Sequence, residues 1–188
     1  APLPPQPASA ATAIPDKVPE PDQASPSEQV RLRLEKNPQD TDARYARALL
    51  LRAAGDNAAA SAELLALLGI DRNHAPAHAS LGTILLESGR STEAGRAFET
   101  SLKIDPENAE AHRGLAQILI AESDWQDAIL HLDKALEHDQ DPYLFADRAK
   151  AWSELGYANR AEPDYARALG ILGDDPFILL DRGRMRAR

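Results

Sequence analysis

An internal repeat governs how this 188-residue chain can fold. Four stretches beginning at Thr41, Ala75, Ala109 and Pro142 follow one another at spacings of 34, 34 and 33 residues. The units share a small residue at the eighth place, Ala at the twentieth and Leu at the twenty-eighth: Ala48, Gly82, Ala116 and Ala149; Ala60, Ala94, Ala128 and Ala161; Leu68, Leu102, Leu136 and Leu169. Repeats of this length form helical hairpins that bury their apolar faces only against neighbouring copies, so we expect an extended stacked array.

The repeated residues resemble the tetratricopeptide repeat (TPR) family over about residues 41–175. The second unit matches the family pattern best, at Leu81, Gly82, Leu85, Gly89, Ala94, Phe98, Leu102 and the Asp105-Pro106 pair. The resemblance implies an all-α fold, a right-handed superhelical α-solenoid of about four TPR hairpins with a capping helix at each end. Its repeats are expected at residues 41–74, 75–108, 109–141 and 142–175.

Local signals place the repeat domain at residues 26–188. Ser25 can cap a helix that begins at Pro26, and Glu28 can return a bond to the cap. Residues 27–40 then form a half-unit that covers the first repeat, and residues 176–188 form a C-terminal capping helix. Helices are expected at residues 27–36, 41–53, 57–69, 75–88, 91–104, 109–122, 125–138, 142–155, 158–171 and 176–187.

The beginning of the chain differs sharply in composition from the repeats. Residues 1–24 hold seven prolines and only three large apolar residues, Leu3, Ile14 and Val18. Such a segment cannot bury enough apolar surface to offset its conformational entropy, so residues 1–25 are expected to be a disordered Pro/Ala-rich linker. The linker is either a tail without a specific role or a spacer between the repeats and a membrane anchor or signal sequence upstream of Ala1.

Charge and composition exclude several classes of function. The formal net charge of -9 argues against general nucleic-acid binding, which needs a basic surface. No apolar run approaches the roughly 18 residues that a membrane span needs. The absence of cysteine removes disulfides, thiolate metal sites and cysteine nucleophiles. No nucleotide-binding, serine-hydrolase or metalloprotease motif is present, so we expect neither enzyme activity nor a cofactor.

Histidines come nearest to a metal-binding pattern. His74 and His78 are four residues apart, a spacing that can place two ligands on one helix face. However, His74 lies in a turn between units. His78 and His112 occupy the same fourth place of successive units, where the TPR family often has an aromatic packing residue. Packing is therefore the favoured interpretation, and no metal site is expected.

The resemblance also implies a binding surface for a protein or peptide partner. In TPR proteins the first helix of each hairpin lines a concave groove. The corresponding residues here are Tyr45, Leu49, Arg52, Thr83, Leu86, Glu87, Arg113, Gln117, Ile120, Tyr143, Lys150 and Glu154. Their apolar members would anchor an extended peptide or an amphipathic helix, or else pack against neighbouring helices. The Lys/Asn/Arg clamp with which some members bind a C-terminal carboxylate is absent, because Leu49 and Thr83 replace its asparagines.

Two units differ from the others at the seventh place, where Arg47 and Arg148 replace Leu. The twenty-third place of the same two units is acidic, with Glu63 and Asp164. The two places lie on facing helices of one hairpin. We therefore predict the ion pairs Arg47–Glu63 and Arg148–Asp164, each with a structural role.

The leading functional hypothesis is a non-enzymatic interaction scaffold that binds a peptide or helix of a partner in the groove. A second hypothesis is a structural protein whose copies associate through the terminal helices. The apolar run at residues 177–180 suits either an inner packed cap or such a subunit contact. A third hypothesis, an accessory subunit of an enzyme, has no supporting motif.

The location of the protein rests on a shorter resemblance. The segment Asn37-Pro38-Gln39-Asp40 resembles the start of the repeat domains of bacterial extracytoplasmic assembly proteins, including those of cytochrome c maturation. Together with the Pro/Ala-rich linker and the lack of cysteine, it favours a bacterial periplasmic or surface-tethered protein. The alternative is a cytoplasmic location.

Overall fold

The computed structural model describes residues 25–187, and this part of the chain forms ten α-helices and no strand. The helices are α1 (Pro26–Lys36), α2 (Thr41–Ala53), α3 (Asn57–Ile70), α4 (Ala75–Glu87), α5 (Ser91–Ile104), α6 (Ala109–Glu122), α7 (Trp125–His138), α8 (Pro142–Glu154), α9 (Ala158–Leu172) and α10 (Pro176–Arg186). Each bound lies within one residue of the range expected from the sequence, which confirms the all-α solenoid. Of the predicted linker, residues 1–24 lie outside the described residues.

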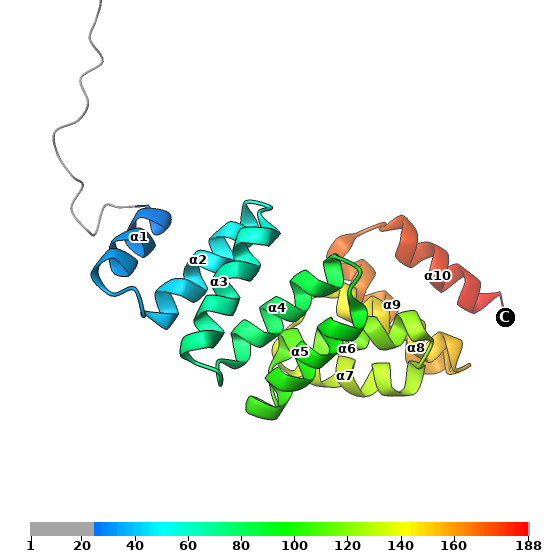
Figure 1. Ribbon diagram of the computed structural model, residues 1–188. Coiled ribbons are helices and arrows are strands. Elements are labelled where there is room, and N and C mark those ends of the chain that lie inside the picture. Colours follow the sequence, from blue (N-terminus) through cyan, green and yellow to red (C-terminus); the bar gives the residue numbers. More distant parts are fainter. Residues whose placement is uncertain (1–24, 188) are drawn as a thin grey trace, which may run out of the picture.

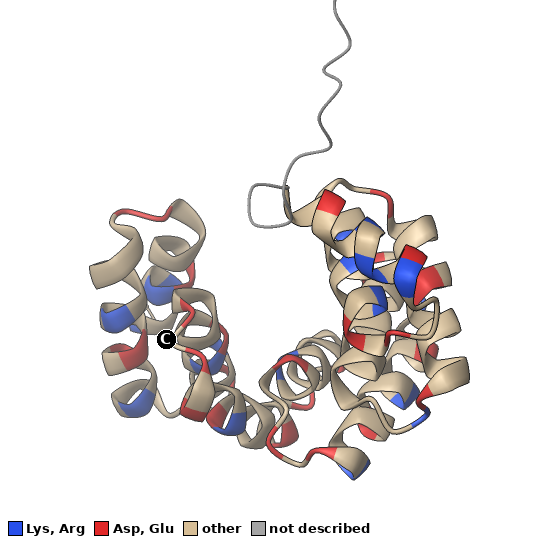
Figure 2. Ribbon diagram, turned by 90° about the vertical axis from the view of Figure 1, so that its left-hand side faces the viewer, with Lys and Arg blue, Asp and Glu red and all other residues tan. Residues whose placement is uncertain are grey.

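The array is built from four hairpins, α2–α3, α4–α5, α6–α7 and α8–α9, with the most extensive contacts inside each hairpin. Helices α1 and α10 lie at its opposite ends (Figure 1), where α1 packs on α2, and α10 packs on α9 and α8. Figure 2 shows the helices curved into an open U whose two arms hold the two ends. None of the helices between residues 25 and 187 is long and apolar enough to cross a membrane.

Polar residues before the helices fix where most of them begin. A side-chain oxygen at the N-cap accepts a backbone N–H of the first turn in many cases: Ser25, Asp40, Asp56, Asn108, Asp124, Asp141 and Asp175. At α1 this confirms the predicted cap, since Ser25 Oγ accepts the Glu28 N–H at 3.3 Å. The predicted return bond is wrong, because the Glu28 carboxylate instead accepts from Arg31 Nε at 2.9 Å.

The turn inside each hairpin requires one residue in the left-handed region. Gly55, Gly89 and Gly156 supply it with φ of 82°, 76° and 84°. In the third hairpin Ser123 takes the same place with φ of 63°, and it is the one non-glycine residue with positive φ among residues 25–187. The turn is kept there despite the steric cost of a side chain.

Small residues let the helices of the central repeats approach closely. Phe98 on α5 is fully buried and its ring lies between Gly82 on α4 and Gly114 on α6. A Cβ added at Gly114 would lie 2.1 Å from Phe98 Cζ, and one at Gly82 would lie 2.7 Å from Cε1. The repeated alanines of the twentieth place are likewise 0% exposed: Ala60, Ala94, Ala128 and Ala161. Close helix packing is therefore the reason for the small-residue pattern of the repeat.

Candidate partner-binding face

The first helices of the hairpins, α2, α4, α6 and α8, together form what we call the inner face. A groove of about 510 Å³ crosses α2, α4 and α6 and is lined by Arg52, Thr83, Leu86, Glu87, Glu110, Arg113, Gly114, Gln117 and Asp139. A smaller hollow of about 250 Å³ lies between α8, α9 and α10 and is lined by Lys150, Ser153, Glu154, Tyr165, Asp181 and Arg184. The structure thus brings eight of the twelve sequence-predicted groove residues into two neighbouring hollows.

A larger hollow, of about 740 Å³, is lined by residues of α5, α6 and α7. Its floor is apolar, with Leu102, Leu115, Ile118 and Leu119, and its charged residues, such as Arg96, are exposed. Exposed charges are already hydrated, and an apolar floor sets no particular ligand chemistry. We therefore look for the site on the inner face, where polar groups converge.

Glu110 ties together three helices in the N-terminal half of the inner face. Its Oε1 accepts from Arg52 Nη1 at 3.0 Å and from Thr83 Oγ1 at 2.9 Å. Its Oε2 accepts from Ser80 Oγ at 3.2 Å, and that hydroxyl also lies 3.2 Å from the hydroxyl of Tyr45. We call these five residues the Glu110 network. The members of the network satisfy one another's hydrogen-bonding groups. The Glu110 carboxylate therefore has all of its donors within the array.

The network gives a structural role to three residues predicted as groove contacts, Tyr45, Arg52 and Thr83. Burial raises the pKa of the Tyr45 hydroxyl above its ordinary value, as expected for a phenol that packs between helices. Sequence reasoning did not single out Glu110 or Ser80. Glu110 stands at the second place of its unit, one of the places that line the groove in TPR proteins, so the same rule points to it. Ser80, at the sixth place, gave no such signal.

Asp147 is the contrasting carboxylate, in the C-terminal half of the inner face. It holds in α8 the sixth place that Ser80 holds in α4, and Ser80 bonds to residues of the first helices on both sides. The equivalent place in α8 faces α6 and α10. The charged groups that act on Asp147 agree with this position, since they include Arg113 of α6 and Asp181 of α10.

The Asp147 carboxylate has no hydrogen bond or ion pair with any residue between 25 and 187. Its side chain is partly buried between the helices. Burial raises its pKa to about 6, from an ordinary value of 3.8, although Lys150 and Arg113 act in the opposite direction. Arg113 itself is 3.1 Å from Asp141 and 3.9 Å from Asp139, so its charge is already shared. A partly buried carboxylate without a protein donor is the unpaired acidic group of the inner face, and it remains accessible from the solvent side.

Several predicted groove residues, including two that line the first hollow, are either exposed to solvent or packed in the core. Leu49 and Tyr143 are 40% and 52% exposed, and Gln117 is exposed as well. Leu86 and Ile120 pack against buried clusters between the helices, so they contribute to the core of the array. Tyr143 is thus the large aromatic residue that the inner face presents to solvent.

The two predicted ion pairs differ in their outcome. Arg148 and Asp164 form the expected bidentate pair, at 2.7 Å from Nε to Oδ2 and 2.8 Å from Nη2 to Oδ1, which confirms that prediction. Arg47 lies 3.5 Å from Glu63, whereas Arg44, one turn earlier, lies 3.2 Å away and is hydrogen-bonded to it. The predicted Arg47 pair is therefore the weaker contact, because Arg44 is less exposed and already occupies the carboxylate.

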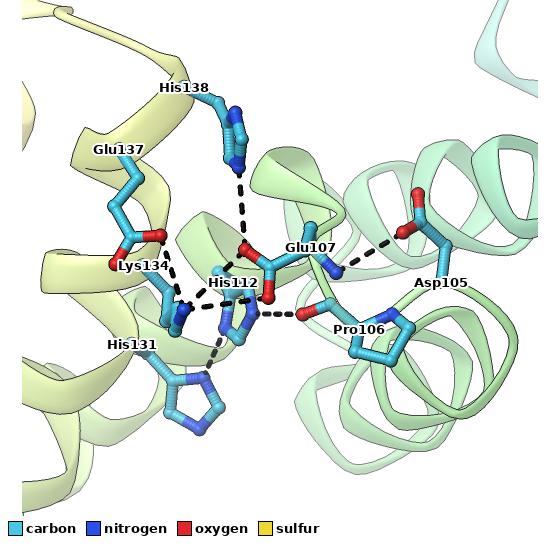
Figure 3. A network of polar contacts seen from close by, with 8 residues as sticks. All are labelled: Asp105, Pro106, Glu107, His112, His131, Lys134, Glu137 and His138. Atoms are coloured by element: carbon cyan, nitrogen blue, oxygen red, sulfur yellow. Dashed lines mark hydrogen bonds and ion pairs between the residues drawn. The ribbon is translucent and has the colours of Figure 1, made fainter.

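A polar cluster joins α6, α7 and the turn before α6 (Figure 3). His112 donates from Nε2 to the Pro106 carbonyl at 2.9 Å, so its Nδ1 accepts from His131 Nδ1 at 2.8 Å. Burial lowers the pKa of His131, which favours the neutral imidazole of that residue. The predicted packing role of His112 thus includes two hydrogen bonds.

The same cluster holds Glu107, Glu137 and His138 close enough together to share a metal ion. Lys134 Nζ, however, lies 3.4 Å from Glu107 and 3.1 Å from Glu137, and it already supplies a positive charge to both carboxylates (Figure 3). All three of the grouped residues are also exposed. The cluster is therefore best explained as a surface ion-pair network between α7 and the turn before α6.

Comparisons with known proteins agree with the architecture. Among curated proteins, no sequence matches the chain. Among solved structures, YrrB, described as a TPR protein with an unusual peptide-binding site, has a TM-score of 0.73 at 20% identity over 86% of this chain and 84% of that one. The thermophilic TPR protein TTC0263 of Thermus thermophilus has a TM-score of 0.63 at 17% identity over 86% and 89%. Pseudomonas aeruginosa pilF has a TM-score of 0.65 at 20% identity over 77% and 67%.

Sequence profiles identify the repeats directly. Two tetratricopeptide repeat profiles match residues 21–86 and 85–151, which together span the first half-unit and most of the hairpins. The profiles, the repeat spacing and the stacked hairpins agree with one another. This chain belongs to the tetratricopeptide repeat family.

Proposed function

We propose that this protein is an adaptor that binds a segment of a partner on the C-terminal half of its inner face, with a basic group of that segment beside Asp147. The TPR family is generally one of non-catalytic protein–protein interaction scaffolds. The peptide-binding site described for YrrB supports a peptide as the ligand class. The proposed contact surface consists of Arg113, Tyr143, Asp147, Lys150 and Asp181.

The unpaired carboxylate of Asp147 is the observation that carries this proposal. A partly buried carboxylate without a protein donor favours a cationic ligand, and a lysine, an arginine or an amino terminus of a partner would satisfy it with a charge-assisted hydrogen bond. Tyr143 offers an exposed aromatic surface beside it for an apolar side chain. The Glu110 network has no such need, because Arg52 already lies 3.0 Å from its carboxylate.

Selection of random peptides displayed on phage against the full chain would test the proposal. We expect the selected peptides to be enriched in Lys or Arg. Fluorescence anisotropy should then show that Asp147→Asn weakens binding roughly tenfold or more, because the ligand's basic group loses its ionic partner. Tyr143→Ala should weaken binding by a smaller factor.

Two exposed positions away from the inner face provide matched controls. Leu65→Ala on α3 and Arg96→Ala on α5, in the hollow of about 740 Å³, should leave binding unchanged. Selected peptides without basic residues, or equal binding by the parent and Asp147→Asn, would contradict the proposal. Loss of binding in Arg96→Ala alone would place the ligand in the hollow of about 740 Å³ instead.

We also propose a periplasmic or surface-tethered location. The Pro/Ala-rich composition of residues 1–24, the lack of cysteine and the Asn37-Pro38-Gln39-Asp40 segment support it. Expression of the full gene with a C-terminal tag, followed by cell fractionation, should recover the protein in the periplasmic or membrane fraction. Recovery in the cytoplasmic fraction alone would contradict this location.

A further inference from the structure

The last helix exposes an unusually apolar surface. Although α10 has only 11 residues, Phe177, Leu180 and Leu179 are 78%, 52% and 40% exposed. Ile171, near the end of α9, is 58% exposed. Phe177 and Leu180 are three residues apart and therefore share one face of the helix. We call these four residues the α10 patch.

The helix that carries the patch is held firmly on the array. Its opposite face is buried through Ile178 and Met185, which join the core cluster of the C-terminal repeat. Glu162 of α9 also pairs with both Arg182 and Arg186 of α10. These two guanidinium groups lower the pKa of Glu162 to about 2. The patch is thus presented on a fixed element, which suits a specific contact.

At the other end of the described array, α1 offers no matching surface. Among the large apolar residues of α1 none is exposed, and the exposed residues of this helix are mostly polar or charged, as at Gln29, Arg31, Arg33 and Glu35. Head-to-tail stacking would place an apolar patch on a hydrated, charged helix. An open chain of copies, in which α10 of one copy joins α1 of the next, is therefore disfavoured, and a closed pair remains.

We propose that α10 joins two copies of this chain tail to tail about a two-fold axis, with the two α10 helices antiparallel. Acidic residues, Asp174 and Asp175, precede α10, and the exposed Arg184 lies in its last turn, whereas Arg186 is already paired with Glu162 of α9. Antiparallel pairing sets the acidic start of each helix beside the basic end of the other, and it also opposes the two helix dipoles. Gly183 has open space around its Cα, so a second helix can approach closely there.

The charge pattern favours a second copy over an unrelated protein. A two-fold contact uses the same surface on both partners, so that surface must be complementary to itself. The α10 patch lies between an acidic helix start and a basic helix end, which meets that condition. This pairing is independent of the ligand proposed for the inner face, and either proposal can fail while the other stands.

Sedimentation velocity of the full chain over a concentration series tests the pairing. The patch is small, so we expect a monomer–dimer equilibrium with a dissociation constant on the order of micromolar. Phe177→Glu with Leu180→Glu should raise that constant roughly tenfold or more. Leu130→Glu on α7, a residue that is 64% exposed, is the matched control and should leave it unchanged.

A single introduced cysteine distinguishes the two-fold arrangement from other contacts, because the chain has no cysteine of its own. Leu180→Cys lies near the middle of α10 and should form a disulfide-linked dimer under mild oxidation. Ile70→Cys on α3 is exposed as well and should stay monomeric. A parent chain that remains monomeric at all concentrations, or Leu180→Cys that does not cross-link, would overturn the proposal. A ladder of higher oligomers would overturn it in favour of open stacking.

Discussion

The two halves of the inner face each contain a carboxylate, and the surroundings of the two carboxylates are opposite in character. In the N-terminal half, Glu110 accepts hydrogen bonds from three side chains of α2 and α4. In the C-terminal half, Asp147 is partly buried, and this burial raises its pKa to about 6. No residue between 25 and 187 donates to it. Hydrogen bonds within the array thus satisfy the carboxylate of the N-terminal half, which we call the closed half. The carboxylate of the C-terminal half, which we call the open half, has no donor.

This difference shows how one repeat pattern can yield both a scaffold and a binding surface. The hairpins of both halves stack through the same small residues, so their backbones need not differ. What differs is the sixth place of the unit, which lies between neighbouring first helices. The two halves differ in whether this place has a hydrogen-bond partner in the next repeat. In the first half the partner is present, and the residues stiffen the array. In the second half it is absent, and the same place is open to a ligand.

The largest effect on stability is expected from a substitution in the helix packing that the two halves share. Gly114→Ala places a Cβ against the ring of Phe98, which lies between α4 and α6, and should destabilise the fold by about 3 kcal/mol through overpacking. Urea denaturation followed by circular dichroism would measure it. Gly170→Ala in α9 has open space and should be neutral or stabilising by up to about 1 kcal/mol. Equal stability of Gly114→Ala and the parent would refute the packing of Phe98 described above.

Removing the carboxylate of the closed half should have the next largest effect. Glu110→Ala leaves Arg52 without its ion pair and Ser80 without an acceptor, so it should cost about 2 kcal/mol of unfolding free energy. Glu122→Ala, at the exposed end of the same helix, should change stability by less than about 0.5 kcal/mol. If the two variants have the same stability, the Glu110 network does not stabilise the array.

Removing the charge of Asp147, in the open half, should change the stability in the opposite direction. The pKa of Asp147 in the folded chain, about 6, lies above its ordinary 3.8, so ionisation opposes folding. The contribution of this group to stability is therefore greatest below about pH 4 and is lost as the pH rises through 6. Asp147→Asn should stabilise the fold by about 1 to 2 kcal/mol near pH 7.5, and the gain should disappear near pH 4. Thermal unfolding at both pH values would show it.

The smallest effect is expected where α10 joins α9. Glu162 is partly exposed, and its pairs with Arg182 and Arg186 lower its pKa to about 2. Because the folded-state pKa is lowered, the pairs contribute above about pH 4.5 and are lost as the pH falls toward 2. Glu162→Gln should cost about 0.5 kcal/mol at neutral pH, since surface pairs are weak. Amide hydrogen exchange in α10 should be faster in this variant, and unchanged exchange there would show that the Glu162 pairs do not hold α10 on α9.

The helices could be predicted from the sequence to within one residue because local signals repeat there. Caps such as Asp40 and Asp56, turn glycines and the buried alanines act within one hairpin, and each recurs at a fixed place. Asp164 opposite Arg148 was found for the same reason. Glu110 and Asp147 were missed because their roles depend on which residues the neighbouring repeats bring beside them. A single unit carries no signal for a partner that is present in one repeat and absent in another.

The unfolding free energies of Glu110→Gln and Asp147→Asn, measured side by side near pH 7.5, test the contrast between the two halves most directly. Both substitutions remove one negative charge from the inner face and keep the shape of the side chain. We predict opposite signs, with Glu110→Gln less stable than the parent chain and Asp147→Asn more stable. Changes of the same sign would contradict the account, because the two carboxylates would then have equivalent surroundings.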